Sequence, residues 1–309
     1  MVEQGPQCRT HHRDIHSFGD EVTWWEKRAI DPVPDALDFD AVPRVRRQEF
    51  VPNLEGPFGR AILILTPRKA HHEKVQKEYR MTADFVPHLN ILPPPQRRLW
   101  DELAAVPAEF VLYGGTALAL HLGHRESLDF DFFGNKPLDP TEMVPAVPFL
   151  VGAIVTQREP NTFSCIVDRG GVVKLLFFGL LGIPRLSPPL IAPDNGVQVA
   201  SLLDLAGTKA AVVQVRAEAK DYIDIDALLT YSAIDLPTAL GAARAIYGTQ
   251  FNPQSTLKAL CYFGEGNLRR LSQSIKDRLV KAACEVDLDR LPMIAVSGRS
   301  PDRDPEPPR

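Results

Sequence analysis

The spacing of apolar and polar residues divides the chain into an irregular N-terminal part, an α/β part and a helical part. In residues 1 to about 60 the apolar residues follow neither the helical nor the strand period, and prolines interrupt them. Residues 61–65 fit a short strand and residues 69–80 a polar helix, and residues 1–90 as a whole are predicted to form a poorly ordered or extended arm. Residues 91–195 contain short apolar or alternating runs bounded by glycine, which are typical of strands. Residues 196–296 change to helical spacing, and the Pro- and charge-rich tail at 297–309 is predicted to be disordered.

Individual elements can be assigned within these parts. Strands are expected at 110–113, 128–133, 150–156, 162–167 and 171–178. Helices are expected at 96–106, 116–122, 201–216, 222–229, 237–247, 254–262 and 273–284. Ser201 and Asp204 form a capping-box pattern, and Gly123 is positioned to close the helix at 116–122. The sequence therefore predicts an α+β fold, in which a mixed sheet with helices is followed by a helical half.

Composition narrows the classes of protein that fit this plan. A content of 44% hydrophobic and 24% charged residues is that of an ordinary globular protein, and the net charge of −4 gives no general attraction to nucleic acid. A local basic patch stays compatible with that charge. The four cysteines form no CxxC pair, which argues against a zinc ribbon or a thioredoxin-type redox site. No apolar run approaches the ~20 residues that span a bilayer, and no secretory signal is evident, so we expect a cytoplasmic protein without a membrane partner.

Two carboxylates on a predicted strand are the first candidate for chemistry. Asp129 and Asp131 are two residues apart and therefore point to one face of the strand, while Leu128, Phe130 and Phe132 point to the other. Like charges held side by side repel each other, and a cation between them removes the repulsion. Hard oxygen ligands with room for substrate phosphates suit Mg²⁺. The pair is therefore a predicted magnesium site.

The second candidate is a glycine turn between a strand and a helix. Gly114 and Gly115 let the backbone approach a ligand closely, and the helix that follows offers free N–H groups to an anion. Thr116 is expected to add a hydroxyl donor. A phosphate-binding turn and a pair of metal carboxylates, separated by one short helix, are the parts needed to hold an NTP.

These motifs together resemble a known family. Gly114-Gly115-Thr116, twelve further residues and then Asp129-x-Asp131, with Arg125-x-Ser127 just ahead, resemble the nucleotidyltransferase superfamily. The similarity is closest to the AbiEii/AbiGii toxin family of type IV toxin–antitoxin and phage-defence systems. A second block strengthens it and consists of Lys209, Arg216 and Lys220-Asp221-x-x-Asp224. The resemblance covers roughly residues 95–235.

The resemblance implies a polymerase-β-like nucleotidyltransferase core, placed here at 91–195, and a helical domain at 196–296. The cleft between them would bind NTP and Mg²⁺ and transfer NMP to an acceptor hydroxyl. The resemblance points to RNA as the acceptor, with the tRNA acceptor end as one candidate. The protein would be a toxin opposed by a cognate antitoxin. Asp129 and Asp131 would bind the metal, and Lys209, Asp221 and Asp224 would complete the catalytic set. The nucleotide-binding set would be Gly114, Gly115, Thr116, Arg125, Ser127 and Lys174.

One departure from the family pattern leaves other functions open. Many nucleotidyltransferases carry a third carboxylate on a later strand, but residues 172–178 contain no acid, and Asp168 in the preceding turn is the nearest substitute. A chain without that carboxylate could be a slow enzyme or a nucleotide-binding module that does not transfer. A small-molecule nucleotidyltransferase of the antibiotic-modifying kind shares the same core motif. In a further alternative, the charged residues of the second block belong to a solvated helix face; they are Lys209, Arg216, Lys220, Asp221 and Asp224. His121 and His124 would then have packing or solvent-exposed roles.

Overall fold

The computed structural model describes residues 85–297, which lie within one compact unit of the chain. Most of the predicted arm and nearly all of the predicted tail lie outside these residues. The predicted domain boundaries themselves stay predictions.

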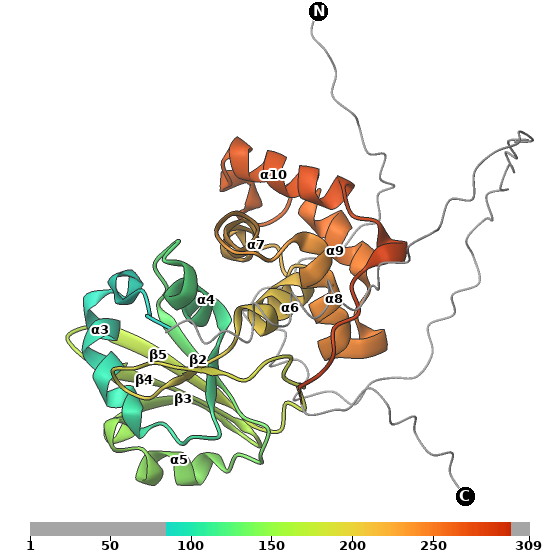
Figure 1. Ribbon diagram of the computed structural model, residues 1–309. Coiled ribbons are helices and arrows are strands. Elements are labelled where there is room, and N and C mark those ends of the chain that lie inside the picture. Colours follow the sequence, from blue (N-terminus) through green and yellow to red (C-terminus); the bar gives the residue numbers. More distant parts are fainter. Residues whose placement is uncertain (1–84, 298–309) are drawn as a thin grey trace, which may run out of the picture. The chain divides into compact units, whose positions relative to one another are not determined.

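A seven-stranded mixed sheet organises the α/β part, in the order β3-β4-β5-β2-β1-β7-β6. Figure 1 labels its strands β2, β3, β4 and β5. The strands are β1 (Val111–Tyr113), β2 (Asp129–Phe133), β3 (Ile154–Glu159), β4 (Thr162–Asp168), β5 (Val172–Phe178), β6 (Leu190–Ile191) and β7 (Gln198–Val199). The central strand β2 pairs antiparallel with β1 and parallel with β5. The strands predicted at 162–167 and 171–178 are antiparallel neighbours, β4 and β5, which form a hairpin around the turn at 168–171.

Helices flank the sheet and then form the second half of the chain, so the predicted α+β fold is confirmed. The helices are α3 (Pro94–Trp100), α4 (Gly114–Leu122), α5 (Pro140–Ala146), α6 (Leu202–Val212), α7 (Ala219–Tyr231), α8 (Leu236–Tyr247), α9 (Pro253–Leu260) and α10 (Gln273–Cys284). Short 3-10 helices connect them at η1 (Leu89–Ile91), η2 (Asp101–Ala105), η3 (Pro148–Leu150), η4 (Gly248–Gln250), η5 (Leu268–Arg270) and η6 (Leu288–Arg290).

The alternation along β2 directs Phe130 and Phe132 to one face of the sheet and Asp129 and Asp131 to the other. Phe130 and Phe132 are fully buried; Phe130 packs against Trp100 of α3, and Phe132 stacks on Phe177 of β5 with ring centroids 5.0 Å apart. Burial of each such ring stabilises the fold by roughly 1.5–3 kcal/mol. The apolar face therefore fixes the register of β2, and with it the side on which Asp129 and Asp131 lie.

The start of α6 joins the helical half to the sheet. Ser201 caps α6 by accepting a hydrogen bond from the Asp204 N–H at 3.1 Å, which confirms the predicted cap. The Asp204 carboxylate accepts hydrogen bonds from the N–H groups of Leu186 and Ser187, and so holds the loop that precedes β6. Further along α6, a Cβ on Gly207 would lie 2.9 Å from the backbone of Ala243, so glycine lets α6 and α8 cross closely.

Three local predictions are corrected by the structure. The helix expected at 96–106 is a seven-residue α3 followed by the 3-10 helix η2. The strand expected at 150–156 begins only at Ile154, because η3 and a turn at Gly152 (φ +82°) occupy the first residues. The short strands β6 and β7 were not predicted, and both belong to the sheet although they flank the predicted boundary at 195–196.

The end of the predicted arm is ordered where it is described. Residues 85–90 approach α4, and the His88 N–H donates to the Leu120 carbonyl at 2.8 Å. The Phe85 ring lies 4.7 Å from the ring of His121. Among residues 85–297, no helix is long and apolar enough to cross a bilayer.

Candidate active site

Asp129 and Asp131 lie on the same face of β2, as the sequence predicted. In the sheet register Asp129 lies opposite Lys174 of β5, and Asp131 lies opposite Tyr113 of β1. Burial, followed by the negative charge of Asp129, raises the pKa of Asp131 to about 6. Two acids this close favour a shared cation or a shared proton.

The N-terminus of α4 is packed directly against this pair. Gly114 has φ +72°, and a Cβ on it would overlap the Oδ2 atom of Asp131. A Cβ on Gly115 would likewise overlap the Nη2 atom of Arg125. The two glycines therefore bring a carboxylate and a guanidinium against the first turn of one helix, where backbone N–H groups are free to bind an anion.

Thr116 has a different position from the one expected. Its side chain is buried, its hydroxyl hydrogen-bonds the Ser127 hydroxyl at 2.8 Å, and it donates to the Asp129 carbonyl. The Thr116 and Ser127 side chains therefore fasten α4 to β2. The predicted phosphate binding at this turn would therefore depend on its backbone N–H groups and not on the Thr116 hydroxyl.

A buried ion-pair network brings the second sequence block to the first. Asp221 and Asp224 of α7 are both fully buried, and Lys209 of α6 bridges them, with its Nζ atom 2.8 Å from Asp221 and 2.6 Å from Asp224. Asp224 also accepts hydrogen bonds from Arg125, at 2.6 Å and 2.9 Å. Asp221 accepts two more from Arg216, the shorter at 2.7 Å.

The positive partners in this network offset the effect of burial on the Asp221 and Asp224 carboxylates. Burial alone would raise the pKa of Asp224, but the charge of Lys209 and hydrogen bonds from His124 and Arg125 hold it well below its usual range. Asp221 is shifted in the same direction, with Lys209 and Arg216 offsetting its burial. The positive charges of Lys209, Arg216 and Lys174 also act on Asp131. The network therefore surrounds the β2 carboxylates with fixed cations.

The alternative of a solvated helix face is wrong for most of the second block. Lys209, Asp221 and Asp224 are each at most 5% exposed, whereas Lys220 is exposed and pairs with Glu218 at 2.8 Å. The structure thus brings the predicted site residues of both blocks together. Their individual chemical roles stay predictions.

Comparison with known proteins gives the family. The model of the nucleotidyl transferase AbiEii toxin of type IV toxin–antitoxin systems matches residues 98–283, well over half of the chain. The chain belongs to this family. The resemblance inferred from the two sequence blocks is confirmed, and the family is one of nucleotidyltransferases.

Individual relatives are more distant. An uncharacterized protein of Aquifex aeolicus is 32% identical over 130 residues, which are 41% of this chain and 61% of that protein. The structure of a putative nucleotidyltransferase from H. pylori shares 19% identity and a TM-score of 0.40, covering 61% of this chain and 89% of that one. The nucleotidyltransferase toxin MenT4 of Mycobacterium tuberculosis shares 16% identity and a TM-score of 0.43, covering 62% and 82%.

The third carboxylate that many nucleotidyltransferases carry has no counterpart on β5 in this AbiEii-family chain. Leu176 occupies the β5 position opposite Asp131 and is buried. Asp168 is no ready substitute, because its carboxylate accepts hydrogen bonds from the Gly170 and Gly171 N–H groups in the hairpin turn. From the sheet spacings it lies roughly 12 Å from Asp129. Among residues 85–297, no group of three acidic, His or Cys side chains could hold a metal ion.

Two histidines at the C-terminal end of α4 take different roles. The His121 Nε2 atom hydrogen-bonds the Ala200 carbonyl at 2.8 Å, and burial lowers the pKa of His121 to about 4, so this side chain is a neutral packing residue. His124 joins the ion-pair network instead, with its Nε2 atom 2.8 Å from Asp224. In the sequence, the position of His124 next to Arg125 was the one indication that it belongs to the site. That position could not show the contact with Asp224 of α7.

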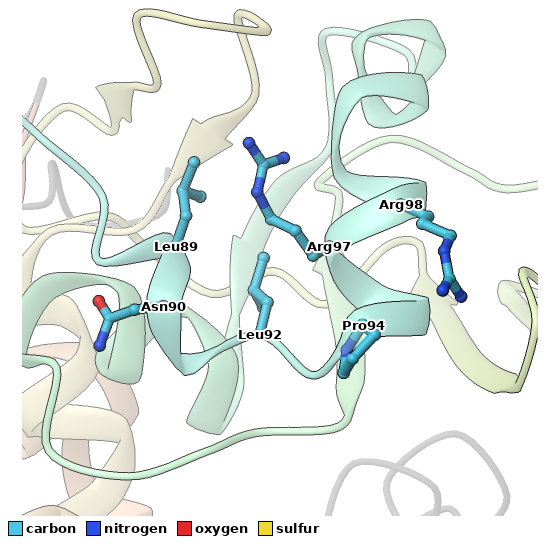
Figure 2. A pocket seen from close by; sticks show the side chains of 6 residues that line it. All are labelled: Leu89, Asn90, Leu92, Pro94, Arg97 and Arg98. Atoms are coloured by element: carbon cyan, nitrogen blue, oxygen red, sulfur yellow. The ribbon is translucent and has the colours of Figure 1, made fainter.

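A shallow pocket lies between η1 and α3 and contains none of the candidate active-site residues. Figure 2 shows its side chains, which come from η1 to α3 and are Leu89, Asn90, Leu92, Pro94, Arg97 and Arg98. Its lining is mostly apolar and includes no acid. Of the described surface, it is the β2–α4–α7 region that carries the candidate chemistry.

Proposed function

We propose that this chain transfers a nucleoside monophosphate from an NTP to an acceptor hydroxyl, and that it acts as the toxin of a toxin–antitoxin pair. The observation that carries the proposal is the contact of the α4 N-terminus with both Asp131 and Arg125. Anion-binding N–H groups, a metal-binding carboxylate and a fixed guanidinium are thereby brought to one point. The proposed acceptor is RNA, the proposed cellular site is the cytoplasm, and the antitoxin is the proposed protein partner.

The chain's own residues account for binding of the triphosphate. The backbone N–H groups at Gly114 and Gly115 would bind phosphate oxygens with the help of the helix dipole. Arg125 has 18% of its side chain exposed, so it can turn one edge to a phosphate while Asp224 holds the other. Lys209, Arg216 and Lys174 would add long-range positive potential around the leaving pyrophosphate.

A divalent metal ion fits Asp129 and Asp131. The pKa of Asp131 is raised by its burial and by the negative charge of Asp129, and a cation between the two carboxylates would relieve both effects. Magnesium sites commonly use one or two carboxylates and take their other ligands from water and substrate phosphates, so two acids are sufficient. Bound there, Mg²⁺ would supply charge stabilisation to the transferring phosphoryl group.

Asp221 and Asp224 are proposed to position cations. Both carboxylates are fully buried, and their oxygens are paired with lysine and arginine side chains. Neither carboxylate therefore has an oxygen free to accept a proton. Their removal would release Lys209, Arg125 and Arg216 from fixed positions. Loss of activity on mutation would then come from a disordered phosphate site.

A second candidate, a nucleotide-binding module that does not transfer, is favoured by one observation. The β5 position opposite Asp131 carries Leu176, so no third carboxylate is available there to assist the attacking hydroxyl. Tight NTP binding without turnover is the behaviour that this candidate predicts.

The test incubates purified protein with Mg²⁺, each of four α-labelled NTPs and total tRNA. The site variant is Asp129→Asn/Asp131→Asn, and the control is Asp139→Asn, which removes an exposed carboxylate that caps α5. Label entering RNA with wild type and control, but not with the site variant, would support the proposal and identify the nucleotide. Binding of NTP without label transfer would favour the binding module, whereas label on an added aminoglycoside in place of RNA would identify a small-molecule acceptor.

A further inference from the structure

Residues 258–281, from α9 to α10, form a basic stretch in an acidic protein. This stretch contains six lysines and arginines but only two acids, whereas the whole chain has a net charge of −4. Arg269, Arg270 and Lys281 are exposed, and Tyr262 places an aromatic ring on the same segment with 51% of its surface exposed. Basic and aromatic side chains interleaved on a surface are the composition that binds single-stranded nucleic acid.

The turn at Gly264 holds the central members of this cluster in place. A Cβ on Gly264 would lie 2.6 Å from the Tyr262 hydroxyl oxygen, so the absence of a side chain makes room for the ring against the turn. The Gly264 carbonyl accepts a hydrogen bond from the Arg269 Nε atom at 3.0 Å. A ring and a guanidinium group are therefore fixed on the same peptide, and the Arg269 Nη groups are left to reach a ligand.

Lys276 of α10 extends the same surface. Its Nζ atom donates to the Arg269 carbonyl at 3.3 Å and lies 5.7 Å from the centre of the Phe263 ring. Phe263 in turn packs edge-on against Tyr222 of α7. The cationic groups thus rest on a framework anchored in α7 and do not simply extend into solvent.

This cluster is attached to the loop that carries Arg216 of the candidate active site. The Ala219 N–H donates to the Asn267 side chain at 2.6 Å, and Gly266 packs against the Ala217 carbonyl so closely that a Cβ would overlap it. Residues 217–219 directly follow Arg216, which pairs with Asp221. A strand whose end lies at the β2 carboxylates can therefore continue onto the basic surface along this loop.

We propose that Tyr262, Arg269, Arg270 and Lys276 form a binding surface for single-stranded RNA, which holds the acceptor while its terminal hydroxyl lies at Asp129 and Asp131. This inference rests on the proposed function. A base stacks on the exposed face of Tyr262, and the neighbouring phosphates pair with the arginines and the lysine. An acidic protein partner would need the cations alone, so the fixed aromatic ring favours RNA.

The test measures binding and transfer separately. Anisotropy with a fluorescein-labelled single-stranded RNA of about 12 nucleotides, a length that covers a typical single-strand site, gives Kd over a series of salt concentrations without NTP. The variants are Tyr262→Ala, Arg270→Glu and Arg269→Glu/Arg270→Glu. The matched control is Lys136→Glu/Arg158→Glu, which reverses two exposed charges on the sheet half. Arg270→Glu tests the surface without disturbing the Arg269 hydrogen bond to Gly264.

We expect Tyr262→Ala to weaken RNA binding by ~5- to ~100-fold, the range for loss of one stacked base. The Arg270→Glu variant should weaken it and lower the slope of log K against log salt by roughly 0.7 per lost phosphate contact. Thermal melting at the wild-type temperature, together with an unchanged KM for NTP, would exclude misfolding. Wild-type RNA affinity in both Tyr262→Ala and Arg270→Glu, or an equal loss in the control, would overturn the inference.

Failure of the proposed function has a different signature. If wild type binds RNA through this surface but incorporates no label, the binding surface stands and RNA transfer fails. If label enters RNA with an unchanged KM for RNA in Tyr262→Ala and Arg270→Glu, transfer stands and the surface is wrong.

Discussion

Replacement of Gly114 by alanine tests the central contact of the candidate site. Gly114 has φ +72°, and its missing Cβ leaves the space that Asp131 Oδ2 occupies. Gly196 has nearly the same backbone angle, φ +75°, but a Cβ there would meet no atom within 4 Å. The pair Gly114→Ala and Gly196→Ala therefore separates backbone strain from collision with Asp131.

The two variants should differ by the collision alone. An alanine in the left-handed region costs ~1–2 kcal/mol, and the smaller entropy of its unfolded chain returns ~0.4–1 kcal/mol. Gly196→Ala should thus lower the free energy of unfolding by about 1 kcal/mol. Gly114→Ala must also displace the Asp131 carboxylate or shift α4, which adds ~1–3 kcal/mol of overpacking.

Urea unfolding followed by circular dichroism measures both values, provided that the m-value stays constant. NTP-dependent transfer should fall sharply in Gly114→Ala and stay at the wild-type level in Gly196→Ala, because only the first variant moves Asp131. Equal destabilisation by the two alanines, within about 0.5 kcal/mol, would refute the contact. A stable Gly114→Ala variant with full activity would refute the importance of the contact for the reaction.

The remaining predictions concern buried charge. Replacing Asp224 by alanine should cost ~3–5 kcal/mol in urea unfolding, because it leaves a buried charge partner unpaired. The matched Asp226→Ala should cost only ~1 kcal/mol, since its partner Arg278 is 49% exposed and can be rehydrated; equal costs would contradict this reasoning. His121 has a folded pKa of about 4, so its neutral form stabilises the protein above its unfolded pKa, and this contribution is lost as pH falls towards 4. Between pH 7.5 and pH 5 wild type should lose ~2 kcal/mol more stability than His121→Gln, and parallel pH profiles would show that burial does not perturb this ring.

Much of the fold could be predicted because neighbouring residues determine it. The alternation of Asp129, Phe130, Asp131 and Phe132 needs only the strand period, and α10 begins and ends where the pattern at 273–284 places it. The strands β6 and β7 could not be found in this way. Each has two residues, too few for a period, and β7 is fixed by its pairing with the distant β1.

For the candidate site as well, local motifs could be predicted and contacts between distant residues could not. The motif residues could be identified from spacing, but their partners could not, since Arg125 and Asp224 are 99 positions apart. The Thr116 hydroxyl was expected to bind phosphate because sequence shows a donor without its direction. In the fold that donor turns inward to the Asp129 carbonyl. The basic stretch at 258–281 is also visible in the sequence, but its charges alone do not show that Tyr262 and Arg269 are held at one glycine turn.

The large sequence separation between Asp224 and its partners on the first block matters while the chain is being synthesised on the ribosome. His124 and Arg125 leave the exit tunnel about one hundred residues before the carboxylate that holds them, since their separations from Asp224 are 100 and 99 positions. An unfinished chain that stops short of α7 has the β2 acids and the glycine turn but neither buried acid to fix Arg125 or Lys209. Nascent chains and fragments truncated before α7 should therefore lack the proposed activity, which requires the buried acids of the helical half.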